Sequence, residues 1–200
     1  IDSISQIAST DELRPVMTGV FKDAENKRLV ATDAMHLVTI DDPTIKKSEI
    51  VIPKTGQVID GKYPNYDAVI PRDNPIKRKA NVKEWLAQLN GLSETKRFFD
   101  KPISARIKIG EQEYYFDSDL MRNVFNVMAE NGIDEVELQL SKPNRALVIE
   151  SNKGVMGLVM PFNIADEYKG GAKTIYQSEL TVEEKNGVVL LPSRFITSKN

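Results

Sequence analysis

Two segments of this chain, residues 81–90 and 118–131, have the apolar spacing of an amphipathic helix, and short strand-like segments surround both of them. Asn81 can cap the first helix, Asp117 or Ser118 can cap the second, and a glycine follows each segment. The apolar stripes consist of Val82, Trp85, Leu86 and Leu89 in the first helix and of Leu120, Met121, Val124, Phe125 and Met128 in the second. Each stripe requires a sheet or another helix to cover it.

The surrounding segments are rich in β-branched, aromatic and alternating apolar residues, and Gly, Asp, Asn and Pro separate them, which is typical of strands. The expected strands are 16–23, 28–40, 50–53, 103–109, 111–116, 136–141, 145–151 and 154–162. A proline-rich connector follows the third strand. Short turns join several of these strands, which favours antiparallel pairing. The pattern predicts an α+β fold with two helices on one face of an antiparallel sheet.

The composition excludes several classes of site. The 200 residues include no cysteine and one histidine, His36, so disulfides, thiol catalysis and multi-histidine metal sites are excluded. No run of about 18 apolar residues is present, and the first residues lack the basic and apolar blocks of a secretory signal. We therefore expect a cytoplasmic protein. His36, alone in a strand, is more often a packed or surface histidine than a catalytic one.

No motif for catalysis is found in the sequence. It contains no nucleophile elbow, no glycine-rich phosphate loop and no metal-ligand spacing. The acidic residues Asp134, Glu135 and Glu137 could hold magnesium, but such a group at a turn and strand start is much more often a solvated edge. We expect a protein that is not an enzyme and has no cofactor.

Charge is distributed unevenly along the chain. The 27 basic and 29 acidic residues give a net charge of -2, yet residues 75–101 hold seven basic and three acidic side chains and so carry +4. Residues 102–168 carry -5. Four members of the basic segment lie close to the first predicted helix: Lys77, Arg78, Lys79 and Lys83. They could contact phosphates without reading a base sequence, or they could be an ordinary solvated helix start.

Three segments resemble the bacterial sliding clamp family, the β subunit of DNA polymerase III. DELRPVMTGVF followed by RLVATDAMHLVTI at 28–40 is similar to the opening of the clamp's middle domain. IDGKYPNYDAVIP at 59–71 resembles the junction between the middle and last domains, and residues 114–164 resemble the C-terminal half-domain with its closing VMP strand. The three segments occur in the family's order.

The resemblance implies one clamp-type domain, residues 1–164, made of two helix-plus-strands half-units at about 1–74 and 75–164. A clamp chain is nearly twice as long and has three domains, and the second half of the middle domain has no counterpart here. Residues 1–9 resemble the end of a helix whose beginning lies outside this chain. Residues 165–200 are an unmatched C-terminal extension, in which we expect a hairpin of 175–182 with 188–192.

The resemblance also implies a function. The family's helices line a ring around duplex DNA, so we expect a processivity or docking factor for DNA replication or repair that binds duplex DNA non-specifically. The DNA-facing candidates are Arg14, Lys77, Arg78, Lys79, Lys83 and Arg122. Expected partners are duplex DNA, a DNA polymerase or other clamp-binding peptides, and further copies of the chain in a homo-oligomer; no membrane is expected. Two alternatives remain: a monomeric interaction module that never encircles DNA, and a magnesium-dependent hydrolase.

In clamps, partner peptides insert apolar side chains into a groove, and the resemblance places a counterpart here. The implied residues are Thr32, Met35, His36, Leu37, Pro71, Leu158, Met160 and Pro161. Ala34, Met35 and His36 replace the Gly, His and Arg of the family pattern, so the pocket chemistry differs from that of the family. Methionines suit irregular apolar partners, although a plain sheet core would contain the same apolar residues.

Overall fold

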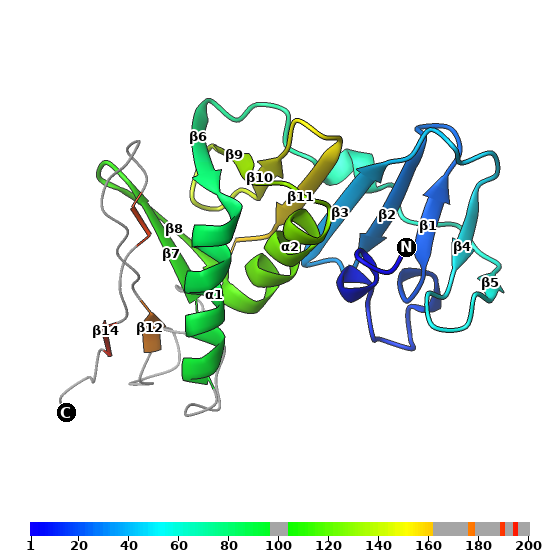
Figure 1. The fold of residues 1–200 in the computed structure, drawn as a ribbon, viewed down its shortest axis with the longest axis horizontal. Coiled ribbons are helices and arrows are strands. Elements are labelled where there is room, and N and C mark those ends of the chain that lie inside the picture. The colour runs from blue at the N-terminus through cyan, green and yellow to red at the C-terminus, as the bar shows by residue number, and fades with distance from the viewer. Residues whose placement is uncertain (97–103, 162–175, 179–188, 191–193, 196–200) are drawn as a thin grey trace.

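The computed structural model describes residues 1–96, 104–161, 176–178, 189–190 and 194–195. The largest sheet contains β1 (Val20–Asp23), β2 (Arg28–Thr32), β3 (His36–Asp41), β4 (Glu49–Val51), β5 (Val58–Ile59), β6 (Ile76–Asn81), β9 (Glu135–Leu140), β10 (Leu147–Glu150) and β11 (Val155–Val159). Its nine strands lie in the order β5-β4-β1-β2-β3-β11-β10-β9-β6 (Figure 1). All pairings in it are antiparallel. The pair β3 and β11 joins the two predicted half-units into one sheet.

Both α-helices belong to the second half-unit: α1 is Val82–Lys96 and α2 is Ser118–Glu130. The predicted caps are confirmed, because the side chain of Asn81 accepts from the Glu84 N–H at 3.0 Å and Asp117 accepts from two N–H groups of the first turn of α2. The prediction that α1 ends at Gly91 is wrong. Burial of Leu92, which is 1% exposed, outweighs the cost of about 1 kcal/mol for a glycine within a helix.

The first half-unit contains only 3₁₀ helices besides its strands. They are η1 (Ser5–Ile7), η2 (Pro15–Met17) and η3 (Tyr66–Val69), the last of which lies in the segment 60–74, here called the connector. The segment 28–40, expected as a single strand, is a hairpin of β2 and β3. A tight turn at Asp33 and Ala34 divides it.

A second sheet contains the predicted hairpin of β7 (Ser104–Ile109) and β8 (Gln112–Asp117). Its other described strands are β12 (Tyr176–Ser178), β13 (Val189–Leu190) and β14 (Arg194–Phe195). β12 and β13 each pair with β7 rather than with each other, so the expected hairpin between them is wrong for these residues. Turn composition specifies only local pairing, whereas the free edge of β7 offers backbone partners from far along the chain.

The two faces of the large sheet have different coverings. On one face, here called the helix face, α1 and α2 pack against alternate residues of the strands, such as Val38, Leu138 and Val159. On the opposite outer face, a smaller cluster joins Leu37, Val148 and Leu158 to side chains of the connector. The prediction of two helices on one face of an antiparallel sheet is confirmed (Figure 1). No helix in the described part of the chain is long and apolar enough to cross a bilayer.

Candidate functional site

The turn between β2 and β3, here called the β2–β3 turn (residues 32–36), is held by the Asp33 carboxylate together with the Thr32 hydroxyl. Asp33 Oδ1 accepts hydrogen bonds from the backbone N–H groups of Met35 and His36, each at 2.8 Å, and lies 2.7 Å from His36 Nδ1. This geometry holds Ala34 at a φ of 78°, a left-handed conformation that a non-glycine residue adopts only when its surroundings impose it. The chain therefore keeps a tight turn without the glycine of the family pattern.

The β2–β3 turn lies beside the end of β11. Leu37 is the register partner of Leu158, and the Met160 N–H donates to the Met35 carbonyl at 2.9 Å. Met35 is 51% exposed and Met160 is 37% exposed, whereas Leu37 and Leu158 are each 2% exposed. The two predicted sides of the groove therefore meet within one chain. Their accessible apolar surface consists of the two methionines, because the connector cluster covers both leucines.

The other predicted groove residues lie elsewhere. His36 is on the helix face, 3% exposed, with its Nε2 3.5 Å from Asn123 Nδ2 on α2, so it cannot line a groove on the outer face with Leu37. Side chains alternate between faces along a strand, and this separates the two neighbours. The buried Thr32 hydroxyl donates to the His36 carbonyl at 2.7 Å and serves the turn itself. Pro161 is half-buried and forms a bridge with Phe116 of β8.

Pro71 belongs to the connector and lines a cavity of about 320 Å³ on the outer face. The connector forms one side of this cavity, and β3, β10 and β11 form its floor. Its apolar lining is Ile70, Pro71, Val148, Val155 and Met156. Two ion pairs flank it, Arg28 with Asp41 at 2.9 Å and Arg72 with Asp67 at 2.5 Å. Pro71 is therefore separated from the two exposed methionines by the covered leucines.

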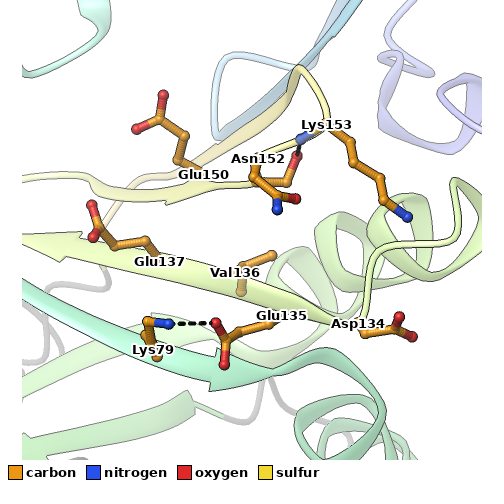
Figure 2. A pocket seen from close by; sticks show the side chains of 9 residues that line it. Lys79, Asp134, Glu135, Val136, Glu137, Glu150, Asn152 and Lys153 are labelled. Carbon is orange, nitrogen blue, oxygen red and sulfur yellow. Dashed lines mark hydrogen bonds and ion pairs between the residues drawn. The ribbon is translucent and has the colours of Figure 1, made fainter.

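A larger cavity of about 470 Å³ lies over β6, β9 and β10 (Figure 2). It is lined by the acidic residues that the sequence singled out, together with Glu150, Lys79 and Lys153. Lys79 Nζ is 2.8 Å from Glu135 Oε1, and this contact raises the lysine's pKa. No group of three or more potential metal-ligating side chains occurs among the described residues, so the magnesium site has no support here.

The six DNA-facing candidates do not form one surface. Lys77 and Lys79 project from the outer face of β6, where they pair with Glu137 at 3.3 Å and Glu135 at 2.8 Å. The intervening Arg78 projects toward the helix face and donates to the Lys77 carbonyl at 2.9 Å. The interpretation of residues 77–83 as one patch beside the helix start is thus wrong, because pairing with β9 makes residues 76–81 a strand with two faces.

The remaining three candidates also differ in their surroundings. Lys83 is exposed in the first turn of α1. Arg14 is exposed in the loop before η2 and pairs with Asp11 at 2.9 Å. Arg122 is partly buried between the helices, where it donates to the Ser93 hydroxyl and pairs with Asp119 at 3.4 Å. Arg122 therefore has a structural role in joining α1 to α2.

Two carboxylates, the buried Asp23 and the partly buried Asp33, have pKa values below the ordinary one. Burial raises the pKa of Asp33, but hydrogen bonds from His36 and the turn's backbone outweigh burial and hold that pKa below its ordinary value. At Asp23, burial is likewise outweighed by hydrogen bonds from Asn26 and Tyr66, so its pKa is also lowered. Burial, together with the Asp23 carboxylate beside it, raises the pKa of Tyr66 to about 12.

Sequence reasoning missed three residues of this region: Asp33, Met156 and Asn123. The Thr-Asp-Ala order before a strand is a signal for the Asp33 turn, because a short carboxylate can accept from the backbone two residues on. Met156 could have been found from its alternation with Leu158 along one strand face. No sequence signal links Asn123 to His36, since the two lie far apart in the chain.

Comparison with known proteins bears on the origin of this arrangement. No family model matches the chain. The beta sliding clamp of Bacillus subtilis (strain 168) is 25% identical over 174 residues, which cover 81% of this chain and 45% of that protein. The chain is thus similar in sequence, over most of its length, to part of the bacterial β sliding clamp. It spans less than half the length of this curated relative.

Solved clamp structures agree with this relationship at the level of the fold. The Bacillus subtilis clamp has a TM-score of 0.64 at 18% identity, covering 80% of this chain and 60% of that one. The Bartonella birtlesii clamp bound to griselimycin has a TM-score of 0.68 at 17% identity, covering 82% and 63%. The Helicobacter pylori clamp bound to a DNA ligase peptide has a TM-score of 0.63 at 14% identity, covering 81% and 62%.

Proposed function

We propose that this clamp relative is a non-catalytic docking factor for DNA replication or repair, which binds partner peptides at the surface formed by Met35 and Met160. The observation that carries the proposal is the hydrogen bond from the Met160 N–H to the Met35 carbonyl at 2.9 Å. It brings two exposed thioether side chains together from segments far apart in the sequence. An apolar pair of this kind, held on a rigid backbone, is suited to receive an aliphatic or aromatic side chain.

The outer-face cavity supplies a second contact point for the same peptide. Met156 and Pro71 line it, and Met156 lies on the same strand as Leu158, two residues away. A peptide that spans from the exposed methionines to this cavity would cross the connector cluster. The flanking pairs Arg28–Asp41 and Arg72–Asp67 supply polar groups that can orient it.

A peptide titration tests the proposal. The probe is the DNA ligase peptide that the Helicobacter pylori clamp binds, titrated calorimetrically into the full chain. We expect saturable binding, weakened at least about fivefold by Met160→Ala or Met35→Ala, as for truncation of a central interface residue. Val58→Ala is the matched control, because Val58 is 50% exposed on the edge strand β5 and should leave binding unchanged. Equal affinity in all four proteins would contradict the proposal.

Non-specific binding of duplex DNA is a second candidate, supported by the exposed side chains of Lys83 and Arg14. The sequences of α1 and α2 together carry three basic and four acidic residues, so the helices have no excess of positive charge. This balance favours docking without encirclement as the main function.

Salt-dependent retention on duplex DNA tests this candidate. Retention should be weak and should fall steeply with ionic strength, because phosphate contacts release counterions. Lys83→Glu with Arg14→Glu should remove most of it. Lys77→Glu with Lys79→Glu is the matched pair and should have a smaller effect, because both lysines lie on the outer face, opposite the helices. If the second pair removed more binding than the first, the helix side would not be the DNA surface.

A further inference from the structure

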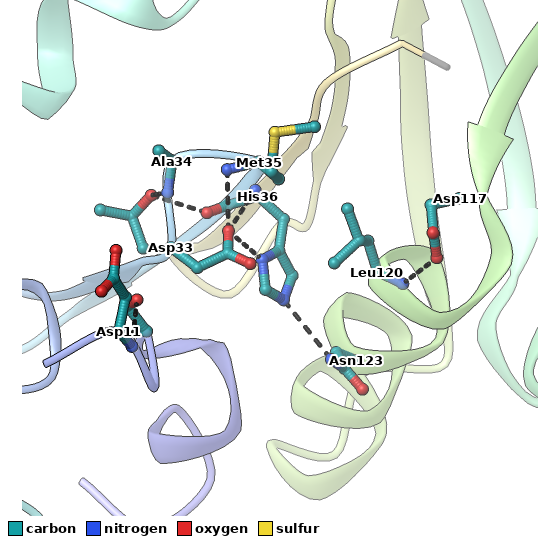
Figure 3. Close-up of polar contacts among 10 residues, drawn as sticks. Asp11, Asp33, Ala34, Met35, His36, Asp117, Leu120 and Asn123 are labelled. Carbon is teal, nitrogen blue, oxygen red and sulfur yellow. Dashed lines mark hydrogen bonds and ion pairs between the residues drawn. The ribbon is translucent and has the colours of Figure 1, made fainter. Parts of the chain in front are cut away.

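The β2–β3 turn contains a buried histidine that the proposed peptide site does not use. His36 is 3% exposed, and its Nδ1 is 2.7 Å from Asp33 Oδ1. The same oxygen accepts the two backbone N–H groups that set the turn, each at 2.8 Å. Figure 3 shows the carboxylate between the turn and the ring, and the ring directed toward Asn123 of α2. This oxygen thus joins the ring to two backbone N–H groups of the turn that carries Met35, beside the separate contacts that the Thr32 hydroxyl makes with Ala34 and His36.

These contacts determine which ring nitrogen carries the proton in the neutral form. Nδ1 must donate, because Asp33 is ionised and its pKa is held below the ordinary value against the effect of burial. Nε2 then accepts from the Asn123 amide at 3.5 Å. A second proton, on Nε2, would make His36 cationic beside Asp33. The Asn123 amide can then rotate to present its oxygen to Nε2–H, so both states of the ring have a partner.

We propose that His36 is a positioning residue for docking: through Asp33 it holds the turn that presents Met35, and its protonation tightens that turn. The inference rests on the proposed docking function and names a regulation of the same site. A hydrogen bond between an ionised donor and an ionised acceptor is stronger than one from a neutral donor to a carboxylate, so the turn is held more firmly when the ring is cationic. Peptide affinity should therefore rise as pH falls.

Other charged groups near the ring are already paired. On α2, Asp119 pairs with Arg122 at 3.4 Å, and Asn123, which faces the ring, is neutral. On the loop before η2, Asp11 pairs with Arg14 at 2.9 Å. On β11, the register partner of His36 is the apolar Val159. Asp33 is therefore the charge that most directly responds to the proton on His36.

Two substitutions separate the ring's two contacts. In His36→Asn, the amide nitrogen lies near the position of Nδ1 and can still donate to Asp33, but it cannot titrate or reach α2. In His36→Gln, the amide lies near the position of Nε2 and loses the Asp33 contact. With the DNA ligase peptide as probe at about pH 8, we expect His36→Asn to bind within about twofold of the native chain and His36→Gln to bind about tenfold more weakly.

The pH profile gives a readout that a purely structural role would not change. Between about pH 8 and about pH 5.5, affinity should rise a few-fold in the native chain and stay flat in His36→Asn, which has no imidazole ring. Asp33→Asn is a second test, at a position that is less buried than His36. It retains an oxygen for the backbone N–H groups and removes the charge, so its profile should also be flat.

The outcomes separate this inference from the docking proposal. If the native chain binds the peptide and all three variants match it in affinity and pH profile, docking stands and the positioning role is overturned. The same holds if thermal melts show equal destabilisation of His36→Asn and His36→Gln and their affinities fall equally. If the native chain does not bind the peptide, the docking proposal fails and this inference fails with it.

Discussion

The two faces of the nine-stranded sheet differ in what covers them, and this difference places the candidate site. On the helix face, regular helices close the core, and Phe125 stacks on Trp85 with ring centroids 5.4 Å apart. On the outer face, an irregular connector covers only part of the apolar row, and Tyr63 stacks on Phe21 at 4.9 Å. The exposed methionine Met35 and the 320 Å³ cavity lie at the ends of that incomplete cover. Apolar surface remains accessible where no regular element covers the sheet.

The largest expected effect tests the closed face. Phe125→Ala removes a side chain that is 0% exposed and should lower the free energy of unfolding by about 3–5 kcal/mol. Phe21→Ala on the outer face should cost less, because Phe21 is only partly buried. Urea unfolding of both variants measures the difference. Equal losses would mean that the two faces are packed alike.

A substitution at Gly157 tests how tightly α2 packs on β11. A Cβ atom at Gly157 would meet a methyl group of Val124 at 2.3 Å, so Gly157→Ala should destabilise the fold by about 1–3 kcal/mol. Adding Val124→Ala should recover part of that loss. Gly91→Ala is the control: nothing lies within 4 Å of a Cβ there, and the change should stabilise α1 by about 0.5–1 kcal/mol.

A smaller effect is expected from the polar anchor of the connector. Tyr66 Oη donates to Asp23 Oδ2 at 2.7 Å, and Tyr66→Phe should cost about 1.5 kcal/mol near pH 7. Because the folded-state pKa of Asp23 is lowered, its contribution is present above the ordinary aspartate pKa and is lost as pH falls through the folded value. The difference between variant and native chain should therefore shrink in acid, as urea titrations at several pH values would record. A constant difference would contradict this assignment.

The smallest effect is expected at the exposed edge of the outer face. Lys79 and Glu135 form an ion pair at 2.8 Å, but both side chains are more than half exposed. Solvent and salt screen such a pair, so Glu135→Ala should leave the unfolding midpoint within experimental error. A clear loss that persists in high salt would show that the edge of the sheet is held by charge.

Local signals predicted the elements well and their pairing less well. The caps at Asn81 and Asp117 are confirmed, because a cap needs only a side chain next to the helix start. The stop at Gly91 was wrong, since burial of Leu92 favours a longer helix. The tail hairpin was also wrong for the described residues, because the edge of β7 competes for the same backbone groups.

The sequence predicted only part of the candidate site, because the exposure of a side chain, like strand pairing, depends on residues far apart in the chain. The sequence suggested that residues 32–37 and 158–161 approach each other, and the structure confirms this through the register of β3 and β11. It could not show which of these side chains remain accessible. His36 and Leu37 are neighbours in the chain, yet one meets α2 and the other lies under the connector.

The sequence by itself determined the α+β class, the two amphipathic helices and their caps, because these depend on spacing and on neighbours within a few residues. Tertiary structure alone decided that Lys77 and Lys79 lie on the face opposite the helices, that Met35 and Met160 form one exposed pair, and that His36 reaches Asn123. These outcomes depend on which strands pair and in what register. A shift of one residue in register reverses the face of every side chain, and residues far apart in the chain decide that register.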